Sequence, residues 1–286
     1  MSPPLVDAHH HFWDPATADY PWMTAAMAPI NRAFGPHDLA PPLAEAGIGG
    51  TILVQARSSL DETQHLLETA ALTAFIEGVV GWVDLTDPAV GNVIANLRAG
   101  AGGGYLVGIR HPAHDEPDPD WLTRADVRRG LAAVAAAGLT FDLLVRPREL
   151  PQALDTVRGL PELRFVIDHL AKPAIREGAL EPWAALVEPF AGLANAWCKL
   201  SGLVTEADWN RWSVSELEPY VDRALEVFGP GRLLFGSDWP VCLLAASYGR
   251  VVSAARQLTL GLSESERAAI FGETARNAYR LGGVAG

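Results

Sequence analysis

Cysteine is nearly absent from this sequence, with Cys198 and Cys242 the two among 286 residues. Two cysteines do not make the disulfide framework that stabilises small secreted domains. Apolar runs of the roughly 20 residues needed to cross a bilayer are also missing. The N-terminus has no basic segment followed by an apolar stretch, as a signal peptide would. These absences predict a cytoplasmic protein that has no membrane partner.

Positive charge is scarce as well. The chain has 22 Lys and Arg against 34 Asp and Glu, a formal net charge of −12. Binding to nucleic acid and to anionic membranes depends on Lys and Arg, so the composition argues against both. The composition is compatible with a small neutral ligand, and it gives no indication of an oligomeric state.

A glycine-rich phosphate loop is the third absence. No GxGxxG follows a strand candidate, and the glycines of AGAGGGY, residues 99–105, come before one. A doubly wound open sheet that binds a dinucleotide through such a loop is therefore the weaker of two fold predictions.

Eight short apolar runs alternate with amphipathic stretches along the chain. The runs are mostly continuous, as expected of parallel strands buried on both faces, and the stretches between them predict helices. Eight such units in under about 300 residues predict a (β/α)₈ TIM barrel, which we expect to form one domain over residues 1–286. The strand candidates are Leu5–His9, Thr51–Gln55, Ile76–Val83, Leu106–Arg110, Thr140–Val145, Arg164–Asp168, Ala196–Leu200 and Leu233–Gly236.

Polar residues gather at the ends of these predicted strands, where barrels of this kind carry their chemistry. Residues two apart on a strand share a face, so His9 and His11 are expected to point to one place and His10 away from it. In a closed barrel the eighth strand lies beside the first, which brings Asp238 next to this pair. His169, after the sixth strand, completes a predicted cluster of three imidazoles and one carboxylate.

Several motifs together resemble the amidohydrolase superfamily, and within it the sugar lactonases, especially L-fuconolactonase-like enzymes. They are DAHHHFWDP from residue 7, VQARSSLDETQHLL from residue 54, GIRH from residue 108, DHLAKP from residue 168, KLSGL from residue 199 and FGSDWPVC from residue 235. The resemblance implies a slightly distorted (β/α)₈ barrel of the amidohydrolase type. It also implies a hydrolase that opens a sugar-acid lactone to the aldonate.

The sequence departs from the binuclear members of that superfamily, which also use a Lys or Glu on strand four and a His on strand five. Strand four offers Arg110 and His111, and strand five, in TFDLLV, has no histidine. The resemblance therefore implies either a single Zn²⁺ or catalysis without metal, as in the related pyrone-dicarboxylate lactonases. The candidate ligands of one zinc ion are His9, His11, His169 and Asp238.

For lactone hydrolysis we expect Asp238 to activate water, while His9, His11 and His169 polarise the carbonyl directly or through zinc. Candidate substrate-binding residues at the same rim are Gln55, Arg57, Trp82, Arg110, His111, Lys172, Trp13 and Trp239. A pyrone dicarboxylate, recognised by Arg57, Arg110 and Arg146, remains an alternative, as do a decarboxylase and a barrel that binds a sugar acid without turnover.

Other polar residues have simpler interpretations. Asp168 is expected to orient a neighbour or cap a turn, and Lys199 and Ser201 to close the end of strand seven through hydrogen bonds. His10 is expected to be structural. The histidines placed in loops or helices, His37, His65 and His114, are expected to be solvated.

Overall fold

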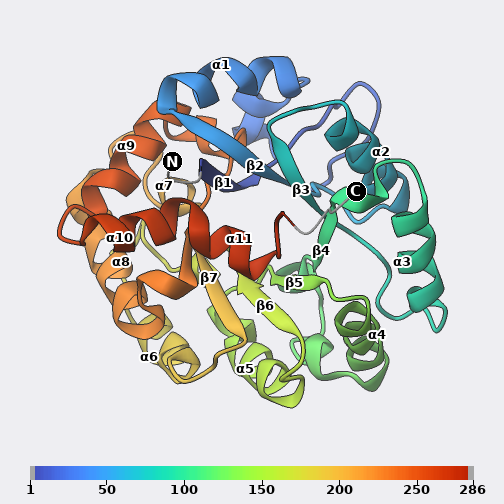
Figure 1. Ribbon diagram of the computed structural model, residues 1–286. Coiled ribbons are helices and arrows are strands. Elements are labelled where there is room, and N and C mark those ends of the chain that lie inside the picture. Colours follow the sequence, from blue (N-terminus) through green and yellow to red (C-terminus); the bar gives the residue numbers. More distant parts are fainter. Residues whose placement is uncertain (1–3, 283–286) are drawn as a thin grey trace.

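Eight parallel strands form a nearly closed barrel with helices around it (Figure 1). The computed structural model describes residues 4–282, so both ends of the predicted 1–286 domain lie outside the described residues. The strands follow one another around the barrel in chain order, which confirms the predicted TIM-barrel fold. They are β1 Leu5–His10, β2 Ile48–Val54, β3 Ile76–Gly81, β4 Leu106–His111, β5 Thr140–Leu143, β6 Arg164–Ile167, β7 Ala196–Leu200 and β8 Leu233–Phe235.

Two strand predictions extend two residues too far at their carboxyl ends, and those for β2, β6 and β8 extend one residue too far. Strand β3 ends at Gly81 rather than Val83, and β5 ends at Leu143 rather than Val145. The apolar runs continue beyond the last ladder position because the residues that follow stay buried as the chain leaves the sheet. Apolar sequence marks burial, and burial does not end where strand pairing ends.

The barrel is distorted where its last strand meets its first. Each consecutive pair from β1 to β8 forms a parallel ladder, with register shifts in the first three pairs, whereas the closing contact is an isolated bridge between His10 and Trp239. Two backbone hydrogen bonds support it, from His11 N to Trp239 O at 2.7 Å and from Asp238 N to His9 O at 2.8 Å. The seam between β1 and β8 therefore lies among the candidate site residues.

Helices cover the outside of the barrel, and their apolar sides pack against the strands (Figure 1). Local signals start and stop them: the Ser59 hydroxyl accepts a hydrogen bond from the amide of Glu62 at the start of α2, and Gly229 follows the end of α8. No helix in the described part of the chain has the length and hydropathy to cross a membrane. The helices are α1 Pro36–Ala46, α2 Leu60–Ala71, α3 Val90–Ala99, α4 Ala125–Ala136, α5 Leu150–Gly159, α6 Trp183–Val187, α7 Leu203–Glu206, α8 Val214–Phe228, α9 Tyr248–Leu258, α10 Glu264–Ala268 and α11 Thr274–Ala278.

The inside of the barrel is filled from its amino end by a small apolar cluster. Val6, Ile52, Val166 and Leu234 are among the strand residues of this cluster, and α11 adds side chains to it from across the barrel (Figure 1). The hydroxyl of Thr140, at the start of β5, donates to the carbonyl of Ala278 at 2.7 Å. Helix α11 thus closes the amino end and leaves the carboxyl end open.

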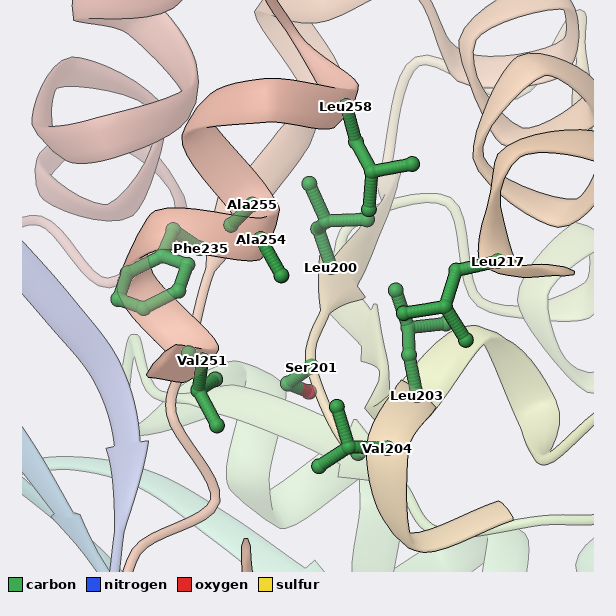
Figure 2. Close-up of a pocket in the computed structure, with 12 residues that line it drawn as sticks. Leu200, Ser201, Leu203, Val204, Leu217, Phe235, Val251, Ala254, Ala255 and Leu258 are labelled. Carbon is green, nitrogen blue, oxygen red and sulfur yellow. The ribbon is translucent and has the colours of Figure 1, made fainter. Parts of the chain in front are cut away.

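A small apolar cavity lies between the ends of β7 and β8 and the helices outside them (Figure 2). Its volume is about 20 Å³, and the one side chain with a polar atom in Figure 2 is Ser201. Val251 of α9 points toward this space (Figure 2). The cavity is a packing defect of the outer core, too small for a ligand.

Filling this defect should stabilise the fold. Val251→Ile adds one methylene group toward the cavity and is expected to raise the free energy of unfolding by up to about 0.8 kcal/mol. The matched control is Val252→Ile on the same helix, because Val252 is 2% exposed and does not line the cavity. Overpacking should make that control less stable by about 1 kcal/mol or more. Urea unfolding of both variants checks this, and an equal loss in the two would contradict it.

Candidate active site

Four side chains converge at the carboxyl end of the barrel, beside the seam. One carboxylate oxygen, Asp238 Oδ1, lies 3.5 Å from His11 Nε2, 3.8 Å from His9 Nε2 and 3.9 Å from His169 Nε2. His9 Nε2 and His11 Nε2 are 3.1 Å apart. The structure therefore brings together the three imidazoles and the carboxylate that the sequence pattern predicted as one cluster.

An irregularity in β1 aims two of these histidines. Val6 and Ala8 belong to the cluster inside the barrel, and Asp7 faces outward, where the Tyr248 hydroxyl donates to it at 3.1 Å. The register with β2 shifts between Asp7 and His10. A bulge changes the direction of the side chains that follow it. The side chain of His9 therefore points into the barrel, as does that of Ala8 directly before it.

Beyond this irregularity His9 and His11 share a face, as predicted. His10 points to the outer side, where its Nε2 lies 2.9 Å from the hydroxyl of Thr51. Asp7 does not belong to the histidine face; its carboxylate instead binds the backbone amides of His9 and Ser237. Its role in the structure is to tie β1 to the segment after β8.

His169 and Asp238 sit on backbone conformations that most residues avoid. His169 has φ 52°, the three residues after it also have positive φ, and Asp238 has φ 57°. Non-glycine residues in the left-handed region cost about 1–2 kcal/mol each and concentrate at functional sites. The run ends at Lys172, whose ammonium group pairs with Glu206 at 2.7 Å.

A fully buried charge cluster lies inside the barrel beneath the histidines. Lys199 Nζ lies 2.6 Å from Asp142 Oδ2 and 2.8 Å from Asp168 Oδ1. Arg110 Nη1 donates to the other oxygen of Asp168 at 2.9 Å, and the Tyr279 hydroxyl donates to Asp142 at 2.8 Å. Two cations thus balance two carboxylates away from water, as buried charges require.

This cluster corrects two interpretations from the sequence. Lys199 does not close the end of its strand; it points into the barrel, because it shares a face with Trp197 of the inner cluster. Of the two alternatives for Asp168, the turn cap is wrong, whereas its contacts with Lys199 and Arg110 agree with orientation of its neighbours. The sequence analysis missed Asp142, although a charge inside the apolar run TFDLL was the available signal.

Burial sets the protonation of the cluster around Asp238. Desolvation lowers the pKa of His169 to about 3, and burial, together with the Lys199 charge, lowers the pKa of His9 well below 6.5. Burial also lowers the pKa of His11. Burial alone would raise the pKa of Asp238. The neighbouring His169 and His11 have the larger combined effect, so the pKa of Asp238 is lowered overall. At neutral pH the site therefore holds one carboxylate among neutral imidazoles.

A cavity of about 1000 Å³ opens above these side chains. Among the predicted substrate-binding residues, five line it: Gln55, Arg57, Arg110, His111 and Lys172. His111 offers the cavity little hydrogen-bonding capacity, because its Nδ1 accepts from Trp82 Nε1 at 3.0 Å and its Nε2 donates to Glu116 at 2.7 Å. Its ring stacks on Trp121, with centroids 4.1 Å apart.

The predicted tryptophan platforms lie elsewhere. Trp13 and Trp239 are 4% and 3% exposed, belong to the outer core and are absent from the cavity lining, as is Trp82. Trp22 lines the cavity instead, in the segment between β1 and α1. Strand ends alone did not reveal it, because the long connection after β1 folds back over the barrel mouth.

One histidine prediction is wrong. His114 is not solvated: it lines the cavity, its side chain is 11% exposed, and its Nδ1 donates to the carbonyl of Leu144 at 3.2 Å. Arg146, also predicted at a strand end, lines the same wall.

His9, His11 and Asp238 fit one divalent metal ion in their spacing and chemistry. Their donor atoms are 3.1–3.8 Å apart, near the about 3.3 Å that separates ligands around tetrahedral zinc. His169 Nε2 lies 3.9 Å from Asp238 Oδ1, and His169 groups instead with His9 and Asp168. A ligating histidine normally donates its other ring N–H to an oxygen. His11 Nδ1 lies 2.8 Å from Val54 O, and His169 Nδ1 lies 2.9 Å from Ser201 Oγ. His9 differs, because its Nδ1 faces Lys199 Nζ at 3.1 Å.

The sequence model of the amidohydrolase family matches residues 6–281. The chain belongs to the amidohydrolase family. Among curated relatives of this amidohydrolase, an L-fucono-1,5-lactonase of Burkholderia multivorans is 42% identical over 96% of each chain. Another L-fucono-1,5-lactonase, of Burkholderia ambifaria, is 40% identical over 96% of this chain and 95% of its own. A crystal structure of a Burkholderia multivorans amidohydrolase with bound zinc superposes with a TM-score of 0.93, at 41% identity over 98% of this chain and all of that one.

Glycine at position 202 is required by the imidazole beside it. A Cβ atom there would lie 2.7 Å from His169 Nδ1, on a backbone with φ 66°. Gly202→Ala should therefore displace His169 and lower the free energy of unfolding of this amidohydrolase by about 2–4 kcal/mol. Gly178→Ala is the matched control, since φ is 64° and no atom lies within 4 Å of the added Cβ. Gly178→Ala should lower the free energy of unfolding by about 1 kcal/mol. If urea unfolding shows the same loss of free energy for both variants, the clash with His169 is refuted.

Glu62 supports the segment that follows β2. Its Oε2 accepts hydrogen bonds from the amides of Ala56 and Arg57, both at 3.0 Å. Burial raises the pKa of Glu62 from 4.5 to about 7, despite the opposing effect of these hydrogen bonds. Between these two values the folded protein keeps a proton that the unfolded chain releases, so this group makes the fold less stable as the pH rises through that window.

Glu62→Gln removes this titration and keeps one side-chain oxygen for the two amides. The free energy of unfolding of the variant, minus that of the natural protein, is expected to increase by about 2 kcal/mol from pH 5 to pH 8. Urea unfolding at several pH values measures it. Glu68→Gln, at an exposed position of the same helix, is the control and should show no such trend. If the difference in free energy of unfolding between Glu62→Gln and the natural protein does not change with pH, the raised pKa of Glu62 is contradicted.

Proposed function

We propose that this amidohydrolase hydrolyses a sugar-acid lactone to the aldonate. The observation that carries the proposal is the single ionised carboxylate of Asp238, which faces His9, His11 and His169 at the floor of a large open cavity. Lactone hydrolysis needs a base for water and a group that stabilises negative charge on the carbonyl oxygen. This arrangement supplies both within one small region.

In the proposed reaction Asp238 takes a proton from water as the water oxygen attacks the lactone carbonyl carbon. N–H donors among the imidazoles, together with the Arg110 guanidinium, stabilise the oxyanion that forms. The bond from the carbonyl carbon to the ring oxygen then breaks, and Asp238 returns the proton to that oxygen. The product is a hydroxy acid, which ionises to the aldonate.

The same side chains are the proposed ligands of a single zinc ion. When bound by His11, His169 and Asp238, with His9 the weakest of the four candidate ligands, zinc would supply Lewis-acid polarisation of the carbonyl. The zinc-bound relative from Burkholderia multivorans supports zinc as the ion.

Substrate contacts are proposed for the polar residues of the cavity wall. Gln55 is placed to bind sugar hydroxyl groups, and Arg57 and Lys172 to hold the emerging carboxylate. Trp22 provides an aromatic face for the apolar side of the sugar ring. These roles replace those that the sequence analysis gave to Trp13, Trp82 and Trp239.

The relatives favour a particular kind of lactone. Two curated relatives at 40–42% identity are L-fucono-1,5-lactonases, so we propose a six-membered lactone of a deoxy sugar, formed when such a sugar is oxidised for breakdown. A pyrone dicarboxylate is the second candidate, because Arg57, Arg110 and Arg146 all line the cavity.

Asp238→Asn tests the proposed base. It should lower kcat by about 10²–10⁴ while the protein still binds the aldonate product. A pH-indicator assay with fucono-, galactono-, arabinono- and rhamnono-lactones, corrected for spontaneous ring opening, measures turnover, and titration calorimetry measures binding. A pyrone dicarboxylate serves as the competing substrate.

The matched control is Asp155→Asn, an exposed carboxylate on α5 away from the cavity, which should keep full activity. Turnover of the pyrone but of none of the lactones would select the second candidate. Absence of turnover with every compound would leave a binding barrel and refute the hydrolase.

A further inference from the structure

Lys199 is the one group of the buried charge cluster that contacts both its carboxylates and a site histidine. It is fully buried, and its ammonium nitrogen lies 2.6 Å from Asp142 Oδ2, 2.8 Å from Asp168 Oδ1 and 3.1 Å from His9 Nδ1. An ammonium group has three hydrogens and no acceptor. The contacts of Lys199 with Asp142 and His9 Nδ1 have hydrogen-bond geometry, and its contact with Asp168 is an ion pair.

This geometry determines which nitrogen of His9 carries hydrogen. Because Lys199 can only donate, His9 Nδ1 must be the acceptor and its hydrogen must lie on Nε2. On the next ring, His11 Nδ1 donates to the carbonyl of Val54 at 2.8 Å, which leaves a lone pair on His11 Nε2. His9 Nε2 lies 3.1 Å from His11 Nε2 and can donate its hydrogen to that lone pair.

Arg110 favours the opposite arrangement, since its Nη1 lies 3.3 Å from His9 Nε2. If Nε2 accepted from Arg110, however, the Nδ1 hydrogen would face the Lys199 ammonium at 3.1 Å. The Nδ1 hydrogen of His9 could bind only Asp168 Oδ1 instead, which lies 3.5 Å from His9 Nδ1. The Nε2 atoms of His9 and His11, 3.1 Å apart, would then present lone pairs to each other. Two longer contacts, at 3.3 Å and 3.5 Å, would replace two at 3.1 Å.

We propose that Lys199 is a positioning residue that holds the hydrogen of His9 on Nε2, where it is donated to His11 Nε2, and so makes His9 a poor zinc ligand. Zinc at His9 Nε2 would require the hydrogen on Nδ1, directly against the Lys199 ammonium. Neither the position of the hydrogen nor its effect on zinc depends on the proposed lactonase function.

The test uses Lys199→Met combined with Asp142→Asn, which removes one charge of each sign and leaves Asp168 paired with Arg110. His9 Nδ1 can then donate to Asp168, and the dissociation constant for zinc, measured by chelator competition, is expected to fall by about 10–100-fold. Tyr279→Phe is the matched control: it removes a hydrogen bond to Asp142 but keeps the contact between Lys199 and His9. Its zinc affinity should equal that of the natural protein.

Nitrogen NMR of ¹⁵N-histidine-labelled protein gives a second readout that does not depend on the double variant. The signals of His9, assigned among the eight histidines by comparison with His9→Gln, should show hydrogen on Nε2 in the natural protein. Hydrogen on Nδ1 would overturn the proposal, as would an unchanged zinc affinity in the folded double variant. Failure to open any lactone would refute the proposed function and alter neither readout.

Discussion

Two backbone hydrogen bonds between β1 and the segment after β8 connect the fold to the site. They run from His11 to Trp239 and from Asp238 to His9, so the residues that close the barrel are neighbours of, or identical with, those whose side chains converge. Closing the sheet and assembling the cluster are therefore one structural event. A shift of one residue in this pairing would turn Asp238 away from the imidazoles.

The charge cluster below the site extends this dependence into the barrel. Asp142 lies on β5 and Lys199 on β7, Asp168 directly follows β6 between them, and Arg110 reaches Asp168 from β4. Buried ion pairs add little net stability, but they require each strand to present its charge at the same height. The cluster thus specifies the alignment of β4 to β7 and sets the electrostatic surroundings of the histidines.

Much of this arrangement was predictable, because each strand of a parallel barrel is a buried apolar run whose polar end faces the mouth. That rule located His9, His11, His169 and Asp238. It did not locate what depends on three-dimensional contacts: the register irregularity in β1, the inward direction of Lys199, and the return of the segment that carries Trp22 over the cavity. The charge inside the run TFDLL signals a buried ion pair but does not name its partner, and a tryptophan far from a strand end has no local pattern that distinguishes a site residue from a packing residue.

The closing helix α11 has a consequence for the order in which the protein can mature on the ribosome. Its neighbour Tyr279 donates to Asp142, and its backbone accepts from the start of β5, so the amino end of the barrel stays open until α11 has been made. Strand β1, made before the other seven strands, meanwhile has one edge unpaired until β8 is made. Synthesis and folding are therefore staggered, and the nascent chain is exposed to aggregation until β8 and α11 have emerged.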